Sequence, residues 1–235
     1  MILRQPPHIV NTLPALHADS ILPPLRGALA QMRLDLSAQQ QGLLLGYLQL
    51  LSKWNQTYNL TAVREPQAML VQHVLDCLAV VVPMHTMMGC GDAATSIELL
   101  DVGSGAGLPG LVLAIACPQI QVTTLDAVQK KVAFMAQAII ELNLRNVRAV
   151  HSRVEKFIPE RAPTVVISRA YASLTNFINA ISHIANGDTI VIAMKGQHPQ
   201  QEIADLPASW RLLAAEPLTV PQLHAERTLI FLRRH

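Results

Sequence analysis

Residues 99–110 read LLDVGSGAGLPG, and this run of glycines limits the fold more than any other feature of the chain. Two leucines, Asp101 and Val102 lead into four glycines, and the apolar run LVLAIAC follows. This order predicts a buried strand, a tight turn and then a helix. Glycines let the backbone approach a ligand closely and adopt positive φ. We therefore expect a ligand site here, the alternative being a tight turn with no ligand.

Short β-like runs alternate with helical runs from residue 97 to the end of the chain. We expect strands at 97–102, 121–126, 147–152, 164–168, 188–196 and 228–234, and helices at 108–117, 128–143 and 174–186. This alternation predicts an α/β fold with a mostly parallel sheet and helices on both faces. In such a sheet, ligands bind beyond the carboxyl ends of the strands, where the strand order reverses.

The segment before residue 97 has a different, helical character. Residues 1–35 are rich in Pro and predict a leader that is partly flexible. Ser37 and Gln40 form a capping-box pattern that begins a helix, and its apolar stripe runs to Trp54. A second helix and a connecting loop are expected at 66–82 and 83–96. We therefore divide the chain into a Pro-rich leader, an N-terminal helical extension and a Rossmann-like core, at 1–35, 36–96 and 97–235.

Composition excludes several classes of protein. Apolar residues make up 51% of the 235 residues and charged residues 14%, so a large core is expected and global disorder is not. The net charge of +2 is too small to identify a nucleic-acid partner. Cys77, Cys90 and Cys117 lack metal-like spacing and predict unpaired thiols in a reducing compartment. Without a signal peptide or an apolar run of about 18–20 residues, we expect a cytoplasmic protein without membrane or metal.

Two common phosphate-binding patterns compete for the glycine run. A Walker A loop needs a Lys after its glycines, and none is present, so this class is excluded. Residues 105–110, GAGLPG, match the dinucleotide pattern G-x-G-x-x-G. However, the turn begins at Gly103, two residues earlier than that pattern requires, and Asp101 stands just before it. A nicotinamide-dependent oxidoreductase remains an alternative.

The pattern D-x-G-x-G-x-G resembles motif I of Rossmann-like methyltransferases that use S-adenosyl-L-methionine. That cofactor has an ammonium, a carboxylate and a cationic sulfur but no pyrophosphate. Asp101 and the loop backbone suit its amino-acid part, and Asp126, at the end of the next strand, suits its ribose hydroxyls. Because a dinucleotide enzyme could use a similar acid, Asp126 does not discriminate by itself.

The methyl acceptor is narrowed by what the sequence lacks. Methylases of adenine or cytosine amino groups commonly carry Asn/Asp-Pro-Pro-aromatic after the fourth strand, where this chain reads ISRAYASL. Cytosine carbon-5 methylation needs a nucleophilic Cys. Cys117 lies at the end of an apolar helix, which favours a position in the hydrophobic core. Cys77 and Cys90 have no basic neighbour to lower their pKa. A guanine N7 already presents a lone pair, so catalysis reduces to alignment of the reactants.

Several segments occur in the order and spacing of one family, and the chain resembles the RsmG (GidB) family over roughly residues 36–235. They are KWNQTYNLTAVREPQAMLVQHVLDCLAVV, LLDVGSGAGLPGLVLAI, SRVEKF, VISRAYASL and AMKGQ. The resemblance implies a class I S-adenosyl-L-methionine-dependent methyltransferase that modifies guanine N7 in 16S ribosomal RNA, free or in the small ribosomal subunit. A methylase of the same fold with another acceptor and a non-catalytic RNA-binding module remain alternatives.

The resemblance also implies roles for individual residues. The cofactor would be bound by Gly103, Gly105, Gly107, Leu108, Asp126, Val154, Glu155 and Arg169. Arg169 and Lys195 would be catalytic, and Asn59, Thr61, His73 and Asp76 would contact the substrate. No metal and no general base are required.

Arg169 and the other basic residues need separate consideration. Arginine commonly binds guanine through both O6 and N7, but a donor on N7 would occupy the attacking lone pair. We therefore expect Arg169 to bind O6, a phosphate or the cofactor carboxylate, the alternative being a buried structural ion pair. Lys195 is expected either to contact the RNA backbone or to lie in solvent at the end of its strand. Five further basic residues are expected either to contact RNA phosphates or to lie in solvent at exposed helix ends, namely Arg145, Arg148, Arg153, Lys130 and Lys131.

Overall fold

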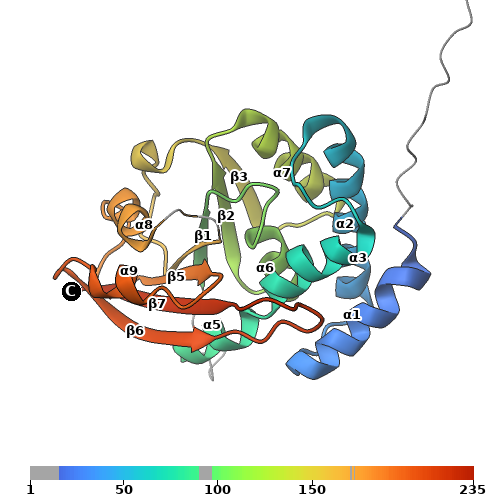
Figure 1. Cartoon of the computed structure of the whole chain (residues 1–235). Helices are drawn as coiled ribbons and strands as arrows, with labels where there is room; N and C mark the ends of the chain where they lie inside the picture. The colour runs from blue at the N-terminus through green and yellow to red at the C-terminus, as the bar shows by residue number, and fades with distance from the viewer. Residues whose placement is uncertain (1–15, 90–96, 170, 172) are drawn as a thin grey trace, which may run out of the picture.

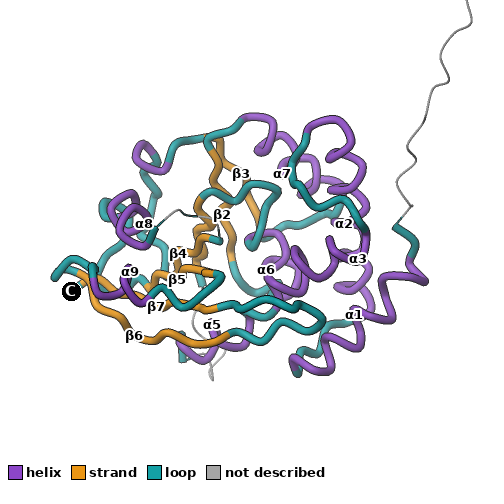
Figure 2. Tube along the Cα trace, viewed as in Figure 1, coloured by secondary structure: helices purple, strands orange, loops and turns teal. Residues whose placement is uncertain are grey.

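The computed structural model describes residues 16–89, 97–169, 171 and 173–235. A seven-stranded sheet forms the central layer, with helices on both faces (Figures 1 and 2). The strand order is β3-β2-β1-β4-β5-β7-β6. The strands are β1 (Glu98–Val102), β2 (Gln121–Asp126), β3 (Val147–His151), β4 (Val165–Ser168), β5 (Ile190–Lys195), β6 (Trp210–Pro217) and β7 (Thr228–Arg234).

The sheet is parallel from β3 through to β5, which confirms the predicted α/β fold. Only β7 and β6 run antiparallel, β7 beside β5 and β6 beside β7. The order of the parallel strands reverses between β1 and β4, where Leu99 is in register with Val165. A crevice for a ligand is expected at the carboxyl ends of these two strands.

Each face of the sheet has its own apolar layer because alternate residues of a strand point to opposite faces. On β1, Leu99 packs with the side of α6 (Gly110–Ala116), while Leu100 packs with α8 (Leu174–Ile181). The helix α7 (Gln129–Glu141) covers β2 and β3 on the α6 side. The short helices η2 (Val154–Lys156) and α9 (Gln200–Ala204) lie on the α8 side.

The helices before β1 lie on the α6 side of the sheet (Figure 1): those nearest the N-terminus form a further layer outside α6 and α7, whereas Val81 and Met84 pack directly on the sheet. The predicted capping box is confirmed: Ser37 Oγ accepts from the amide of Gln40 at 3.3 Å, and Gln40 Oε1 accepts from the amide of Ser37 at 2.9 Å. Gln40 Nε2 also donates to the carbonyls of Ile115 and Ala116, both at 3.0 Å, and so joins this layer to the end of α6. The helices are α1 (Ala18–Met32), α2 (Ala38–Tyr58), α3 (Pro66–Met69), η1 (Leu70–Leu75), α4 (Asp76–Leu78) and α5 (Val81–Met87).

The predicted Pro-rich leader is wrong for residues 18–32, which form α1. Pro23 and Pro24 lie inside this helix, and each lacks the amide hydrogen that a helix interior normally uses. The helix persists because Ile21, Leu25, Ala28 and Leu29 are buried against the core. Residues 1–15 lie outside the described part of the chain. Tertiary packing here overrides the local signal from proline.

Two further expectations differ from the structure. The predicted loop at 83–96 begins later, because α5 continues to Met87; residues 90–96 are not described. The edge strand β6 was not predicted from the sequence. Its register shifts between Leu212 and Ala214, so the alternation of buried and exposed residues is broken there. Its edge position also leaves much of the strand exposed.

The helical run Pro66–Met87 is long and apolar enough, by length and composition alone, to cross a membrane. From the sequence we expected a helix at 66–82, the first part of this run, and no apolar run long enough to cross a membrane. Its most apolar window is 72% buried inside the fold, as in the core helix of a globular domain. Cys77, on this run, and Cys117, after α6, are both buried free thiols, as expected for core positions; Cys90 lies outside the described residues.

Candidate active site

The glycine loop follows β1 at the carboxyl edge of the sheet. Gly103, Gly105 and Gly107 have φ of 70°, 59° and 82°, values that favour glycine. At Gly107 a side chain would also collide with Leu111. The amides of Gly103 and Ser104 donate to the carbonyl of Leu125 at 2.8 and 3.1 Å. The loop is therefore fixed against β2 and leaves open space above Gly103, where a Cβ would meet nothing within 4 Å.

Asp101 lies beneath this loop and is fully buried. Its Oδ2 accepts from the amide of Gly110 at 2.8 Å, and its Oδ1 has no hydrogen-bond partner among the described residues. Burial raises the pKa of this carboxyl to about 7, although the hydrogen bond from Gly110 lowers it. A Cβ at Gly110 would lie 2.8 Å from Oδ2, so this fourth glycine is needed for close approach. Asp101 supports the start of α6 from below.

Asp126 joins the glycine loop to the turn after β2. Its Oδ2 accepts from the amide of Gly105 at 2.9 Å, and its Oδ1 accepts from the amide of Val128 at 2.8 Å. Lys131 Nζ lies 3.8 Å from Oδ2. Each carboxylate oxygen can accept more than one hydrogen bond, so both can still accept from ribose hydroxyls.

A cavity of about 230 Å³ opens beside Asp126. It brings together four of the residues expected to bind the cofactor, which are Gly103, Asp126, Val154 and Glu155. Tyr171 also lines it, with its ring centroid 5.1 Å from that of Phe177. The remaining lining residues are Val102, Leu125, Ala127, Ser152 and Arg153. An acid, open backbone and an apolar wall with an aromatic ring fit the ribose and adenine of the expected cofactor.

The other expected cofactor residues do not line this cavity. Gly105 and Gly107 shape the loop, and the amide of Gly107 donates to the carbonyl of Ser104 at 2.9 Å. Leu108 is buried in the core beside α2 and α6. Tyr171 is the aromatic lining residue that sequence reasoning missed. Its position in the segment VISRAYASL, directly after the fourth strand, was the available signal.

A second cavity of about 390 Å³ lies at the ends of β4 and β5. Three of the expected residues line it, namely Asp76, Arg169 and Lys195, together with Met194, Gly196 and Arg227. The buried carboxylate of Asp76 stands between two arginines: Arg227 Nε donates to Oδ1 at 2.8 Å, and Arg169 Nη1 lies 3.4 Å from Oδ2. Arg169 Nη1 also donates to the carbonyl of Gln72 at 2.8 Å. Asp76 therefore holds two of the three cations that line this cavity.

Lys195 and Arg227 reach this cavity in different ways. Lys195, at the end of β5, forms an ion pair of 2.8 Å with Glu202 on α9. Glu202 also accepts from the amide of Leu174, so Lys195 is fixed between two helices of the α8 side. Arg227 was missed by sequence reasoning. No local motif marks it, because it comes to the site only through the antiparallel pairing of β7 with β5.

The remaining expected substrate residues lie apart from this cavity. Thr61 Oγ1 and His73 Nε2 are 2.9 Å apart, and His73 is buried. Burial, and then the charge of Arg169, lower the pKa of His73 to about 4, so the ring is neutral near pH 7. Asn59 is exposed and ends α2 with a φ of 49°, while its Oδ1 accepts from Arg64 Nη2 at 2.8 Å.

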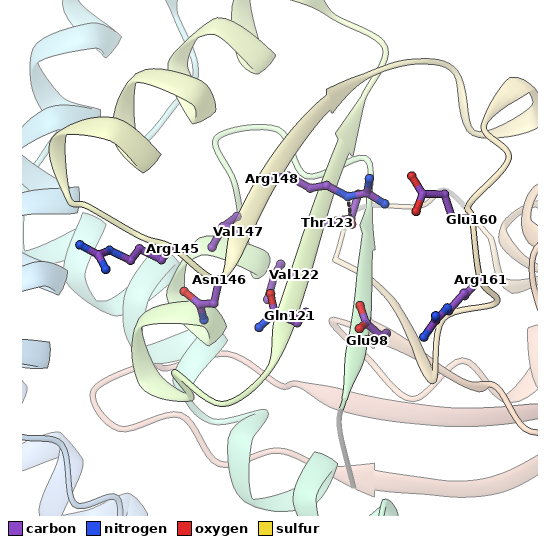
Figure 3. Close-up of a pocket in the computed structure, with 10 residues that line it drawn as sticks. All are labelled: Glu98, Gln121, Val122, Thr123, Arg145, Asn146, Val147, Arg148, Glu160 and Arg161. Carbon is purple, nitrogen blue, oxygen red and sulfur yellow. Dashed lines mark hydrogen bonds between the residues drawn. The ribbon is translucent and has the colours of Figure 1, made fainter.

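A further cavity, of about 470 Å³, opens at the opposite edge of the sheet (Figure 3). Glu98, Gln121 and Val147, the first residues of β1, β2 and β3, line it with Arg145, Arg148 and Arg161. It is therefore remote from the glycine loop. Among the described residues, no group of three or more His, Cys, Asp or Glu side chains is placed to hold a metal ion.

Together, the strand order, the glycine loop and the cavity beside Asp126 define a Rossmann-like methyltransferase that uses S-adenosyl-L-methionine. The chain belongs to the rRNA small subunit methyltransferase G (GidB) family, whose model matches residues 40–231. This finding confirms the resemblance drawn from the sequence.

Relatives of the chain agree with this assignment. The chain is 48% identical over 203 residues to ribosomal RNA small subunit methyltransferase G of Methylibium petroleiphilum, covering 86% of this chain and 90% of that protein. It is 48% identical over 211 residues to the Bordetella avium protein of the same name, covering 89% of this chain and 92% of that protein.

Two solved structures share the fold at low sequence identity. A SAM-dependent methyltransferase from Aquifex aeolicus has a TM-score of 0.51 at 16% identity and covers 72% of this chain and 93% of its own. TrmN from Thermus thermophilus has a TM-score of 0.52 at 16% identity, and the match covers 74% of this chain and 55% of TrmN.

Proposed function

We propose that this protein transfers a methyl group from S-adenosyl-L-methionine to N7 of a guanine in 16S ribosomal RNA, acting in the cytoplasm on the free RNA or the small ribosomal subunit. One observation carries this proposal: in a member of this family, the cavity beside Asp126 and the cation-lined cavity at Arg169 share the carboxyl edge of the sheet. Arg169 and Tyr171, from the same short segment, line one cavity each.

The chemistry suits a site with no general base. The bound cofactor supplies a methyl carbon attached to a cationic sulfur. The N7 lone pair forms the new C–N bond as the C–S bond breaks, and the sulfur keeps that electron pair. Positive charge thus passes from sulfur to the purine, and no proton is transferred. The protein has to align the reactants, a contribution of up to about 7–11 kcal/mol in favourable cases.

The residues at the first cavity hold the cofactor in this proposal. Asp126 accepts from the ribose hydroxyls with lone pairs left free by Gly105 and Val128. Val154 and Tyr171 form the apolar wall for adenine, and Glu155, exposed at the rim, accepts from its exocyclic amine. Open backbone at Gly103 leaves room for the methionine part.

The second cavity receives the guanine. Arg169 Nη1 donates to the carbonyl of Gln72 and to the carboxylate of Asp76, and these two bonds fix the plane of the guanidinium group. Its remaining donors bind guanine O6, a phosphate or the cofactor carboxylate, and leave N7 free to attack. Asp76 thus positions Arg169 and Arg227, and Lys195, fixed by Glu202, lies where an RNA phosphate passes.

The test uses 16S ribosomal RNA and small subunits from cells that lack this protein. The purified protein is incubated with each and with methyl-labelled S-adenosyl-L-methionine, and the RNA is then digested and its nucleosides identified. We expect label in N7-methylguanosine at one position, and its loss on Arg169→Ala. Label in another nucleoside, or none in either RNA, would overturn the proposal. Calorimetry with the cofactor checks its binding independently of the acceptor.

A further inference from the structure

A ladder of aromatic rings leads from the core beneath the glycine loop to the protein surface. Buried Tyr47 lies 6.2 Å from Phe134, Phe134 lies 5.7 Å from Trp54, and Trp54 lies 5.1 Å from Tyr58, measured between ring centroids. The ladder ends at Tyr58, which is 43% exposed. Its hydroxyl makes no hydrogen bond to any described residue. An apolar ring is thus held at the surface by the rings beneath it.

Tyr58 lies at the same edge of the sheet as the cofactor cavity. It is the last residue of α2, and its carbonyl accepts from Lys130 Nζ at 3.0 Å. Lys130 is in the first turn of α7, which follows directly from Asp126 and its turn. The two helices lie side by side (Figure 1). The exposed ring therefore lies at the surface where the end of α2 meets the start of α7, at the carboxyl edge of the sheet.

The charge around Tyr58 is positive. Lys130 and Arg64 are both exposed, and Arg64 is fixed beside Tyr58 by its 2.8 Å hydrogen bond to Asn59. Both cations keep further donors free, since an ammonium has three and a guanidinium five. The neighbouring acid, Glu65, instead uses its carboxylate to cap α3, accepting from the amides of Gln67 and Ala68 at 3.0 and 2.6 Å. We name Tyr58, Arg64 and Lys130 the Tyr58 platform.

We propose that the Tyr58 platform binds an unpaired nucleotide of the substrate RNA, with its base stacked on the Tyr58 ring and its phosphates at Arg64 and Lys130. Proteins bind splayed-out RNA bases by stacking them on aromatic rings, and this stacking tolerates any base. An exposed aromatic flanked by cations fits that ligand class better than an acidic or apolar protein partner. The inference rests on the proposed function, because it takes the substrate to be RNA. The platform would hold RNA outside the reaction centre and would not contact the reacting atoms.

The first experiment measures the affinity of the full-length protein for 16S ribosomal RNA that lacks the methyl group. Tyr58→Leu removes the ring but keeps apolar bulk, whereas Tyr58→Phe keeps the ring. We expect an affinity about ten-fold weaker for Tyr58→Leu and unchanged for Tyr58→Phe. Ile140→Ala, at an exposed apolar residue on the far part of α7, is the matched control and should bind normally. Equal binding by Tyr58→Leu and the natural protein would overturn the inference.

The cations are tested by salt dependence. Arg64→Gln and Lys130→Gln should each reduce the slope of log affinity against log salt by nearly one ion. Arg211→Gln is the matched control, because Arg211 is exposed on β6 near the opposite edge of the sheet. An unchanged slope in both platform variants would contradict phosphate contacts at this surface.

A second measurement leaves the platform intact. The chain has two tryptophans, and Trp210 is buried on β6, so Trp210→Phe leaves Trp54 as the sole indole. Because Trp54 lies against Tyr58, RNA stacked there should change the indole fluorescence. No change at RNA concentrations that saturate methyl transfer would overturn the inference. If the natural protein methylates no RNA at all, the proposed function fails first; normal methylation with normal binding by Tyr58→Leu defeats only the platform.

Discussion

The hydroxyl of Tyr47 donates a 2.8 Å hydrogen bond to the carbonyl of Ala106, which joins α2 to the middle of the glycine loop. Both residues are buried. One of the N-terminal helices therefore supports the glycine loop directly. The family match from residue 40 onward includes this helix almost completely.

Tyr47→Phe should uncouple α2 from the loop without creating a cavity. The carbonyl of Ala106 would stay buried and lose its partner, so the free energy of unfolding should fall by about 1–2 kcal/mol. Affinity for S-adenosyl-L-methionine should fall as well, because the loop loses a support. Urea denaturation and calorimetry measure the two effects. Tyr58→Phe is the control, and equal stability of the two variants would refute the role of this bond.

Gly110→Ala should disturb the loop from below. A Cβ there would lie 2.8 Å from Asp101 Oδ2 and 2.7 Å from Thr124 Cγ2, so backbone has to move at the start of α6. We expect lower thermal stability and weaker cofactor binding. Gly42→Ala, inside α2 with nothing within 4 Å of its Cβ position, should instead raise stability by up to about 1 kcal/mol. The opposite order of the two melting temperatures would be incompatible with this packing.

Arg227→Gln should reduce methyl transfer more than it reduces cofactor binding. Arg227 lines the cavity proposed for the guanine and holds Asp76 Oδ1 at 2.8 Å, but it does not line the cavity beside Asp126. We therefore expect weaker binding of RNA or a lower kcat, with the dissociation constant for S-adenosyl-L-methionine nearly unchanged. Arg233→Gln, further along the same strand, should leave transfer intact. Parallel loss of cofactor affinity in Arg227→Gln would argue against two separate cavities.

Two buried groups should give opposing pH dependences of stability. Burial raises the pKa of Asp101 to about 7, so its stabilising contribution is full below about pH 4 and is lost as pH rises to 7. Burial lowers the pKa of His73 to about 4, so its contribution is full above pH 6.5 and is lost as pH falls towards 4. Each effect is at most a few kcal/mol, at about 1.4 kcal/mol per pKa unit.

Single substitutions distinguish the contributions of Asp101 and His73 to the pH dependence of stability. Asp101→Asn should leave a protein whose stability rises more steeply between pH 4.5 and 7 than that of the natural chain, since His73 is then the one of these two groups that still titrates. His73→Gln should show the reverse, with stability falling over the same range. Urea denaturation at several pH values measures both slopes. Identical pH profiles for the two variants would contradict the assigned shifts.

The sequence predicted the parallel core because its strands are buried apolar runs with clear ends. The bounds of β2 and β7 agree with those expected from QVTTLD and TLIFLRR. It failed at α1, where two prolines concealed a helix that packing stabilises. The cavity beside Asp126 contains residues marked by local motifs, so it could be predicted. Arg227 could not, because only the long-range pairing of β7 with β5 brings it to Asp76.

The position of β7 has a consequence for how the protein is made. The strand β7, which follows β6 in the sequence, lies between β5 and β6, inside the sheet (Figure 1). A ribosome that has not yet released residues 228–235 therefore holds a nascent chain whose sheet has a gap, with β6 lacking its partner and Arg227 without an anchor. The cavity at Arg169 and Arg227 can therefore form only after β7 has entered the sheet. Removal of residues 228–234 should consequently abolish activity as completely as removal of β5.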